Sequence, residues 1–151
     1  MKHLLLLTLF AFTWAPVTAA EPAPSIDTAI AKGDTAEVQR LLTAQPELVR
    51  TLGAGKMLPL HQAILRKKAD IVALLVERGA DLNAPAPSLR TPLHLAVERS
   101  DAALVKTLLA RRADTTGRDR MGWTPLHHAA AKDKSDIARL LLDGGAKPNF
   151  L

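Results

Sequence analysis

The sequence predicts an all-α solenoid in which about four helix pairs stack in a row. A six-residue segment occurs at residues 58–63 (LPLHQA), 91–96 (TPLHLA) and 124–129 (TPLHHA), so its copies are 33 residues apart. A fixed period of this length is the signature of a repeat protein. Aromatic residues make up only 3% of the chain and tyrosine is absent. The core must therefore consist of aliphatic side chains and alanine, which suits helices that pack closely on helices.

The first helix of each pair is expected to begin at this segment. The hydroxyl groups of Thr91 and Thr124 can cap the helix, and the proline after each of them fits the first helical position, where no N–H is needed. The leucines that follow are expected to point inward (Leu60, Leu93 and Leu126). The alanines at the end of the segment are small because neighbouring helices must approach closely.

The second helix of each pair is expected where apolar residues recur at spacings of three and four. These stripes are Ile71-Val72-Leu74-Leu75, Leu104-Val105-Leu108-Leu109 and Ile137-Ala138-Leu140-Leu141. Gly79 and Gly145 follow the first and third stripes, where a left-handed residue ends a helix, and Arg112 takes this place after the second. A divergent copy at residues 33–42 precedes the others and lacks the segment's opening, as suits a terminal repeat.

The first 20 residues have the layout of a secretory signal peptide. Residues 1–3 form a short basic opening, residues 4–14 are almost wholly apolar, and small residues lead to Ala20. The apolar stretch is shorter than the roughly 20 residues that a membrane-spanning helix needs. We expect cleavage after Ala20, with Ala19 as the other candidate, and a mature protein in the periplasm or, alternatively, secreted. The competing interpretation is a buried hydrophobic helix.

The repeats resemble the ankyrin repeat family over roughly Ser25 to Leu151. The resemblance implies an antiparallel helix pair in each repeat and a hairpin-like finger that projects between repeats. The domains expected are a signal peptide at 1–20 and an ankyrin repeat domain at 21–151, with repeats at about 25–57, 58–90, 91–123 and 124–151. Because the family generally binds proteins and has no catalytic residues, we expect an adaptor or regulator. The alternative is an immunity or inhibitor protein that neutralises a periplasmic enzyme or toxin.

The histidines of the repeated segment (His61, His94 and His127) are not expected to bind metal. One histidine per repeat gives a row along the stack, and in the family this histidine holds the turn together by hydrogen bonds. His128 has no histidine counterpart, and a metal site formed with His127 and Asp133 is a lesser alternative, because adjacent helical residues point in different directions. We expect His128 to be a surface contact residue. The chain also has no cysteine, no nucleophile elbow and no phosphate-binding glycine loop, so we expect no enzyme and no cofactor.

By the same resemblance, contacts with a partner are expected just before each repeated segment and just after its alanines. The residues predicted to bind a partner are Arg66, Arg90, Glu98, Arg99, Arg120, Met121, Trp123, His128 and Lys132. Trp123 is the most informative, because residues 119–123 match the family's finger and tryptophan is enriched at the energetic centres of interfaces. The competing interpretation is that Trp123 only packs over the neighbouring finger. The fingers at 52–57 and 83–90 depart from the family pattern, since the first is rich in glycine and the second contains two prolines.

The predicted contact residues are mostly basic, and the whole chain carries a formal net charge of +5. Such a surface favours a partner protein whose own surface is acidic. Nucleic acid is not expected, because an exported protein rarely meets it. Stable membrane anchoring is not expected either, since no basic amphipathic helix is evident. We expect a monomer, and the region of Leu141 and Leu142, which no closing repeat follows, is the alternative site of self-association.

Overall fold

The computed structural model describes residues 25–148, and the predicted signal peptide lies outside this range. Within it, the chain forms eight α-helices and two short 3₁₀ helices and contains no strand. The α-helices are α1 (Ile26–Lys32), α2 (Thr35–Ala44), α3 (Pro59–Leu65), α4 (Ala69–Glu77), α5 (Pro92–Glu98), α6 (Ala102–Ala110), α7 (Pro125–Ala131) and α8 (Ser135–Asp143). The 3₁₀ helices η1 (Pro46–Arg50) and η2 (Ala54–Lys56) lie between α2 and α3. The predicted all-α fold is confirmed for the described residues.

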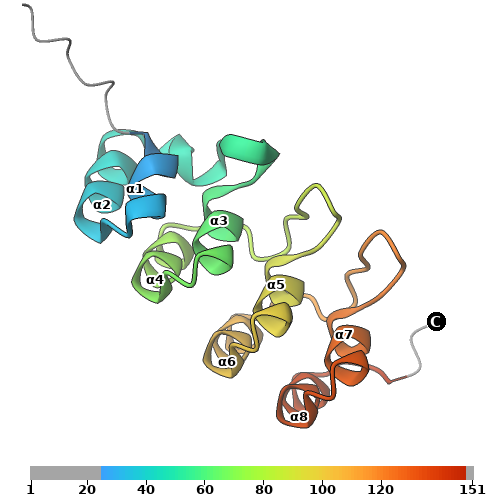
Figure 1. Cartoon of the computed structure of the whole chain (residues 1–151). Coiled ribbons are helices and arrows are strands. Elements are labelled where there is room, and N and C mark those ends of the chain that lie inside the picture. Colours follow the sequence, from blue (N-terminus) through green and yellow to red (C-terminus); the bar gives the residue numbers. More distant parts are fainter. Residues whose placement is uncertain (1–24, 149–151) are drawn as a thin grey trace, which may run out of the picture.

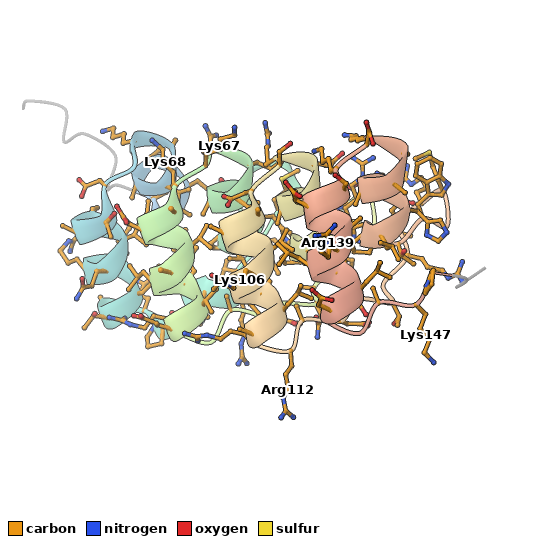
Figure 2. The ribbon with its side chains drawn as sticks, turned by 90° about the horizontal axis from the view of Figure 1, so that it is seen from below. Lys67, Lys68, Lys106, Arg112, Arg139 and Lys147 are labelled. Atoms are coloured by element: carbon orange, nitrogen blue, oxygen red, sulfur yellow. The ribbon has the colours of Figure 1, made fainter. Side chains whose placement is uncertain are left out.

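The helix pairs lie side by side in one row, from α1 and α2 at one end to α7 and α8 at the other (Figure 1). The first helices of the pairs, α1, α3, α5 and α7, pack on one another in sequence and form an inner layer. The second helices form the outer layer, which faces the viewer in Figure 2. The fingers join each outer helix to the next inner helix and project from one side of the row (Figure 1). This arrangement is the stack that the 33-residue period predicts.

The inner helices α5 and α7 begin with capping boxes made by threonine and histidine. Thr91 N donates to His94 Nδ1 at 3.2 Å, and the Thr91 hydroxyl lies 2.8 Å from the same nitrogen. Thr124 and His127 repeat this arrangement at 3.2 and 2.7 Å. Since Nδ1 accepts from a backbone N–H, the ring proton is on Nε2, and His94 Nε2 donates to the carbonyl oxygen of Trp123 at 2.9 Å. The hydrogen-bonding role predicted for this histidine is therefore confirmed at His94.

Helix α3 begins without this cap, because Leu58 stands where the next two repeats have threonine. His61 is fully buried, and its Nε2 donates to the carbonyl oxygen of Ala84 at 2.8 Å. Its Nδ1 is also buried but has no hydrogen-bond partner within the described part of the chain. Burial lowers the pKa of His61, so the ring is neutral at pH 7.

Left-handed residues follow the outer helices, as the glycine pattern predicts. Gly79 and Gly145 have φ angles of 81° and 93°, a conformation that costs glycine little. Arg112 has a φ of 60° in the same place after α6. The turn is therefore kept there although the side chain disfavours it.

The core consists of aliphatic side chains in two clusters. One belongs mainly to α1–α4 and includes Leu60, and the other belongs to α5–α8 and includes the fully buried Leu93. Leu126, their counterpart in α7, is only partly buried at the end of the described stack. Leu141 was expected to be partly bare, but it is fully buried, whereas Leu142 is 44% exposed. The predicted apolar patch is therefore wrong for Leu141, because that side chain faces α6 and α7 rather than the end of the stack.

The two core clusters meet beneath an open groove of about 200 Å³ between α4 and α6. Small side chains line it, among them Val76 and Thr107, where the tighter junction of α6 and α8 has Leu109 and Leu140. The stack is thus least well filled at its centre. None of the helices within residues 25–148 has the length and apolar character needed to cross a bilayer.

Candidate protein-interaction surface

The three fingers share one backbone turn. In each, a backbone N–H donates to the carbonyl oxygen four residues later at 2.9 Å: Gly53 to Met57, Ala86 to Arg90, and Asp119 to Trp123. The fourth residue of each turn has a positive φ, of 57° at Lys56, 60° at Leu89 and 79° at Gly122. Only the third finger has the aspartate and glycine that the family pattern requires. The first two nevertheless adopt the same turn.

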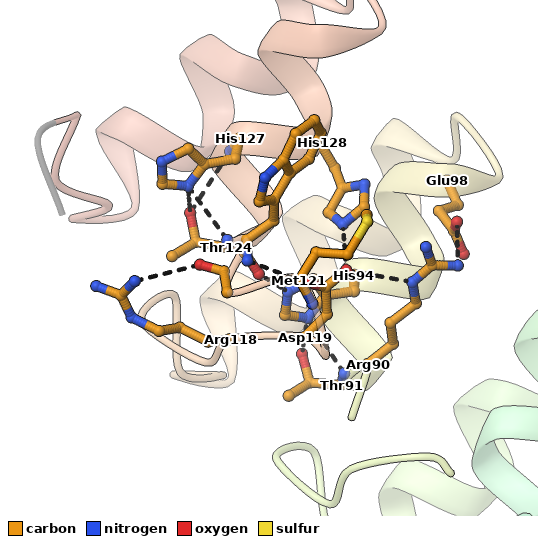
Figure 3. A network of polar contacts seen from close by, with 12 residues as sticks. Arg90, Thr91, His94, Glu98, Arg118, Asp119, Met121, Thr124, His127 and His128 are labelled. Carbon is orange, nitrogen blue, oxygen red and sulfur yellow. Dashed lines mark hydrogen bonds and ion pairs between the residues drawn. The ribbon is translucent and has the colours of Figure 1, made fainter. Parts of the chain in front are cut away.

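The third finger is built around the side chain of Asp119, which is only 5% exposed. Its Oδ1 accepts from Met121 N at 2.9 Å and Trp123 N at 3.0 Å, and its Oδ2 accepts from His128 Nε2 at 2.8 Å (Figure 3). Burial alone would raise the pKa of Asp119, but the hydrogen bonds from His128, Trp123 and Met121 lower it to about 2. The carboxylate is therefore ionised at neutral pH and holds the finger in one conformation.

His128 lies in the interior, so its prediction as a surface contact residue is wrong. It is 3% exposed, and its ring lies 5.3 Å from that of Trp123, which covers it, and 5.7 Å from that of His94. The physical reason is the buried Asp119 carboxylate, which needs a donor at this position. The lesser metal hypothesis gains nothing from this pair, since no three His, Cys, Asp or Glu side chains in residues 25–148 are placed to hold a metal ion.

Arg90 and Glu98 neutralise one another. Arg90 Nη1 donates to Glu98 Oε1 at 2.6 Å, and Arg90 Nε lies 3.6 Å from Asp119 Oδ2 (Figure 3). Both side chains are largely covered, with 28% and 20% of their surface exposed. These two predicted contact residues thus join the second finger, α5 and the third finger, and their charges are already partnered.

Trp123 and Met121 present the main apolar surface of the third finger. Met121 is 61% exposed and Trp123 is 38% exposed. The Trp123 ring packs against His127 and His128 of its own repeat, at 6.4 and 5.3 Å, rather than over the neighbouring finger. Packing on one side therefore leaves part of the indole open to solvent.

Arg120 links the third finger to the second. Its Nη2 donates to the carbonyl oxygen of Pro87 at 3.0 Å, and its backbone N–H donates to that of Ser88 at 3.3 Å. The residue is nevertheless exposed. Most of the guanidinium's donors are thus free of these two contacts, because guanidinium carries five N–H groups.

The first and second fingers replace the Asp119–His128 pair in different ways. In the first, a side chain on Gly53 would place its Cβ 2.1 Å from Asp27 Oδ1, so the Asp27 carboxylate from α1 occupies that space. Gln62, the counterpart of His128, donates to the same oxygen at 2.7 Å. In the second finger the two positions are apolar, Ala86 and Leu95, and both are buried. Sequence reasoning missed this set of pairs.

Two family models match the chain. One, described as ankyrin repeats (3 copies), matches residues 87–150, and the other, ankyrin repeats (many copies), matches residues 60–109. Together they cover residues 60–150, which is more than half of the chain. This is an ankyrin repeat protein. A search of curated proteins found no match to it. Ankyrin repeats are generally modules of protein–protein interaction.

The contact residues predicted for this ankyrin repeat protein fall into three groups in the structure. Arg120, Met121 and Trp123 are exposed on the third finger; Arg66, Arg99 and Lys132 are exposed at the ends of the inner helices; and Arg90, Glu98 and His128 are engaged with one another or with Asp119. Only the first two groups offer side chains that a partner could contact without first breaking an ion pair or opening the core. The third group supports the finger from beneath.

Proposed function

We propose that this ankyrin repeat protein is an adaptor or regulator that binds a partner protein outside the cytoplasm, with the third finger at the centre of the interface. The observation that carries the proposal is the exposure of Met121 and Trp123 on a turn held by the buried Asp119. Tryptophan and methionine are enriched at protein interfaces, and tryptophan at their energetic centres. We call Arg120, Met121 and Trp123 the finger surface.

The rigidity of the turn favours binding. Asp119 fixes the N–H groups of Met121 and Trp123, and Arg120 fixes the finger to its neighbour through Pro87. A surface that is already ordered loses less conformational entropy when it binds. The finger surface thus combines apolar area with a preformed shape.

Charge indicates the kind of partner. Arg120, Arg66, Arg99 and Lys132 are exposed, whereas the one acidic residue of the predicted set, Glu98, is paired with Arg90. The charge offered to a partner is therefore positive, and it would steer an acidic protein surface towards the stack. The proposal includes no catalytic step and no cofactor, and the protein would act as a monomer.

The proposed location depends on the predicted signal peptide, residues 1–20. A periplasmic protein of a Gram-negative bacterium is the primary proposal, and a secreted one is the alternative. Inhibition of a periplasmic enzyme or toxin would use the same finger surface, and the identity of the captured partner would distinguish inhibitor from adaptor.

The test is capture of a partner from a periplasmic extract by residues 21–151. Trp123→Ala should reduce the amount captured by at least about tenfold, the effect of losing an interface residue worth 1.4 kcal/mol or more. Leu142→Ala is the matched control, because Leu142 is 44% exposed but lies on α8, away from the fingers. The far-UV circular dichroism of both variants should equal that of the parent.

Fluorescence gives a second measurement. Trp123 is the only tryptophan in residues 21–151, so intrinsic emission reports on this side chain alone. A partner seated on the finger surface should shift the emission of Trp123 to shorter wavelength, because binding removes the indole from water. Capture that Trp123→Ala leaves unchanged, together with unshifted emission, would rule out the finger surface as the binding site.

A further inference from the structure

A row of three cations stands at the ends of the inner helices. Arg66, Arg99 and Lys132 directly follow the last residues of α3, α5 and α7, and all three are exposed. They are 33 residues apart in the chain, so they occupy the same place in successive repeats. We call them the cation ladder. Each inner helix begins at a finger and ends at the ladder, so the ladder and the finger surface lie at opposite ends of these helices.

The charges of the cation ladder are not neutralised within the described residues. The cations that form ion pairs there are Arg40, Arg90 and His128. The side chains of Arg66, Arg99 and Lys132 make no hydrogen bond or ion pair with residues 25–148. An exposed cation without a carboxylate partner is available to a carboxylate from another molecule.

The neighbouring Lys134 shows by contrast what a cation with a structural role looks like. Its Nζ donates to the carbonyl oxygens of Val97 and Glu98 at 2.6 and 3.2 Å, at the end of α5. Burial lowers the pKa of Lys134, and the positive charge of Lys132 lowers it further. Lys132 therefore acts on its surroundings as an unscreened charge.

The carboxylates along the same edge are engaged elsewhere. Asp34 and Asp101 accept from Glu37 N and Leu104 N, at 3.0 and 2.9 Å, and so cap the starts of α2 and α6. These caps satisfy helix N-termini, where a negative charge is favoured. They leave the cations at the ends of the inner helices without a partner.

The spacing of the ladder follows from helix packing. The inner helices α3, α5 and α7 pack side by side, and packed helices lie about 8–10 Å apart. A polyproline II segment has three residues per turn and rises about 9 Å in that turn, so every third side chain points the same way. An extended strand cannot match this as well, since its side chains alternate between faces with a period of two.

From this match we propose that the cation ladder binds an extended acidic segment of the partner protein, with a carboxylate at every third residue. The proposal rests on the function proposed above, because it names the partner segment that meets the inner-helix ends while another part of the partner meets the finger surface. The three carboxylates would each face one of Arg66, Arg99 and Lys132. The segment would run along the stack, across three repeats.

The experiment uses residues 21–151 and synthetic peptides as probes. A labelled peptide of three Glu-Pro-Ala units carries a carboxylate at every third residue, and its isomer carries the three glutamates in succession. At low ionic strength, fluorescence anisotropy should show about tenfold tighter binding of the spaced peptide, since three exposed ion pairs of ordinary strength give about this factor. The preference should decrease as salt is added.

Two triple variants of equal net charge locate the binding. Replacing Arg66, Arg99 and Lys132 by glutamine should abolish the preference for the spaced peptide. The matched control replaces three cations of the outer layer, Lys106, Arg112 and Arg139, which also form no ion pair among the described residues (Figure 2). The control should bind like the parent, and circular dichroism should show that both variants are folded.

Several results would overturn the cation ladder. These are equal binding of the two peptides, equal loss in the two triple variants, tighter binding of a helical peptide with glutamates seven residues apart, or displacement of the spaced peptide by an equal concentration of oligothymidylate. A partner captured through Trp123 that the ladder variant still binds fully would also overturn the ladder and leave the proposed function standing. Conversely, a peptide preference that depends on the ladder, without capture that depends on Trp123, would uphold the ladder and reject the finger surface.

Discussion

The second and third fingers have the same backbone turn and opposite interiors. Ala86 and Leu95 make the second finger apolar, whereas Asp119 and His128 occupy the same two positions in the third. Both turns close with a 2.9 Å hydrogen bond, so the turn itself does not require the aspartate. The two positions change character together, because a buried carboxylate without a donor, or a buried imidazole without an acceptor, would be costly.

The difference coincides with what each finger presents. The third finger carries Met121 and Trp123, and the N–H groups of both are fixed by Asp119. The second finger presents Leu89 and two prolines, whose rings already restrict its backbone. A buried polar pair thus orders a finger whose sequence is less restricted, and proline orders the other.

The sharpest way to break this comparison is to turn the third finger into the second. His128→Leu should lower the free energy of unfolding by about 3 kcal/mol, because it leaves the ionised Asp119 buried without its side-chain donor. Adding Asp119→Ala recreates the apolar pair of the second finger, and the double variant should be more stable than His128→Leu alone. Urea denaturation followed by circular dichroism measures both. Simple addition of the two single-variant losses would show that the positions are independent.

Acid should distinguish the two interiors through Asp119. The pKa of this carboxyl is lowered from 3.8 to about 2 in the folded protein, so the unfolded chain takes up the proton first as pH falls. The stability that Asp119 contributes is complete above about pH 4 and is lost as pH falls towards 2, a change of about 2 kcal/mol. Urea denaturation between pH 5 and 2.5 should show this loss in the parent but not in the Asp119→Ala/His128→Leu variant. Parallel curves for the two proteins would contradict it.

The first finger offers a steric test of the third solution. Gly53→Ala should cost about 1–3 kcal/mol, because the added Cβ would lie 2.1 Å from Asp27 Oδ1 and the carboxylate must move. Asp27→Ala in the same chain should remove the clash, so Gly53→Ala should cost far less in that background. Thermal unfolding of the four proteins measures the difference. An unchanged cost in the Asp27→Ala background would mean that the carboxylate does not occupy this space.

The smallest effect concerns the cap that α3 lacks. Leu58→Thr should raise the free energy of unfolding by about 1 kcal/mol, because the hydroxyl can donate to the buried Nδ1 of His61 and cap the helix as Thr91 does. Leu58→Val is the control, because it has a branched side chain of similar shape and no hydroxyl. The gain should disappear in a His61→Leu background, and stabilisation that persists there would assign the effect to something other than the cap.

Local features of the fold could be predicted because they depend on neighbouring residues. The caps at Thr91 and Thr124 reach only three residues along the chain, to His94 and His127. The left-handed turns at Gly79 and Gly145 are likewise set by the residue that occupies them. The exposure of Trp123 also follows from its place in the finger.

The contacts that support the site could not be predicted in this way. Gln62 meets Asp27 across 35 residues, and the prediction for His128 failed because Asp119 reaches it from the opposite side of the finger. The columns 53, 86, 119 and 62, 95, 128 are visible in the repeat alignment. Their pairing is not visible there, because in the first finger the carboxylate comes from a different helix.

The sequence by itself determined the repeat, the helix pairs and the family, because a period of 33 residues and helical spacing are properties of the order of side chains along the chain. Only the tertiary structure decided which charges are open to a partner. Arg90 and Arg99 are equally basic in the sequence, yet Arg90 is paired with Glu98 and Arg99 is not. Pairing depends on the direction in which packed helices and fingers hold their side chains, and that direction exists only once the repeats are stacked.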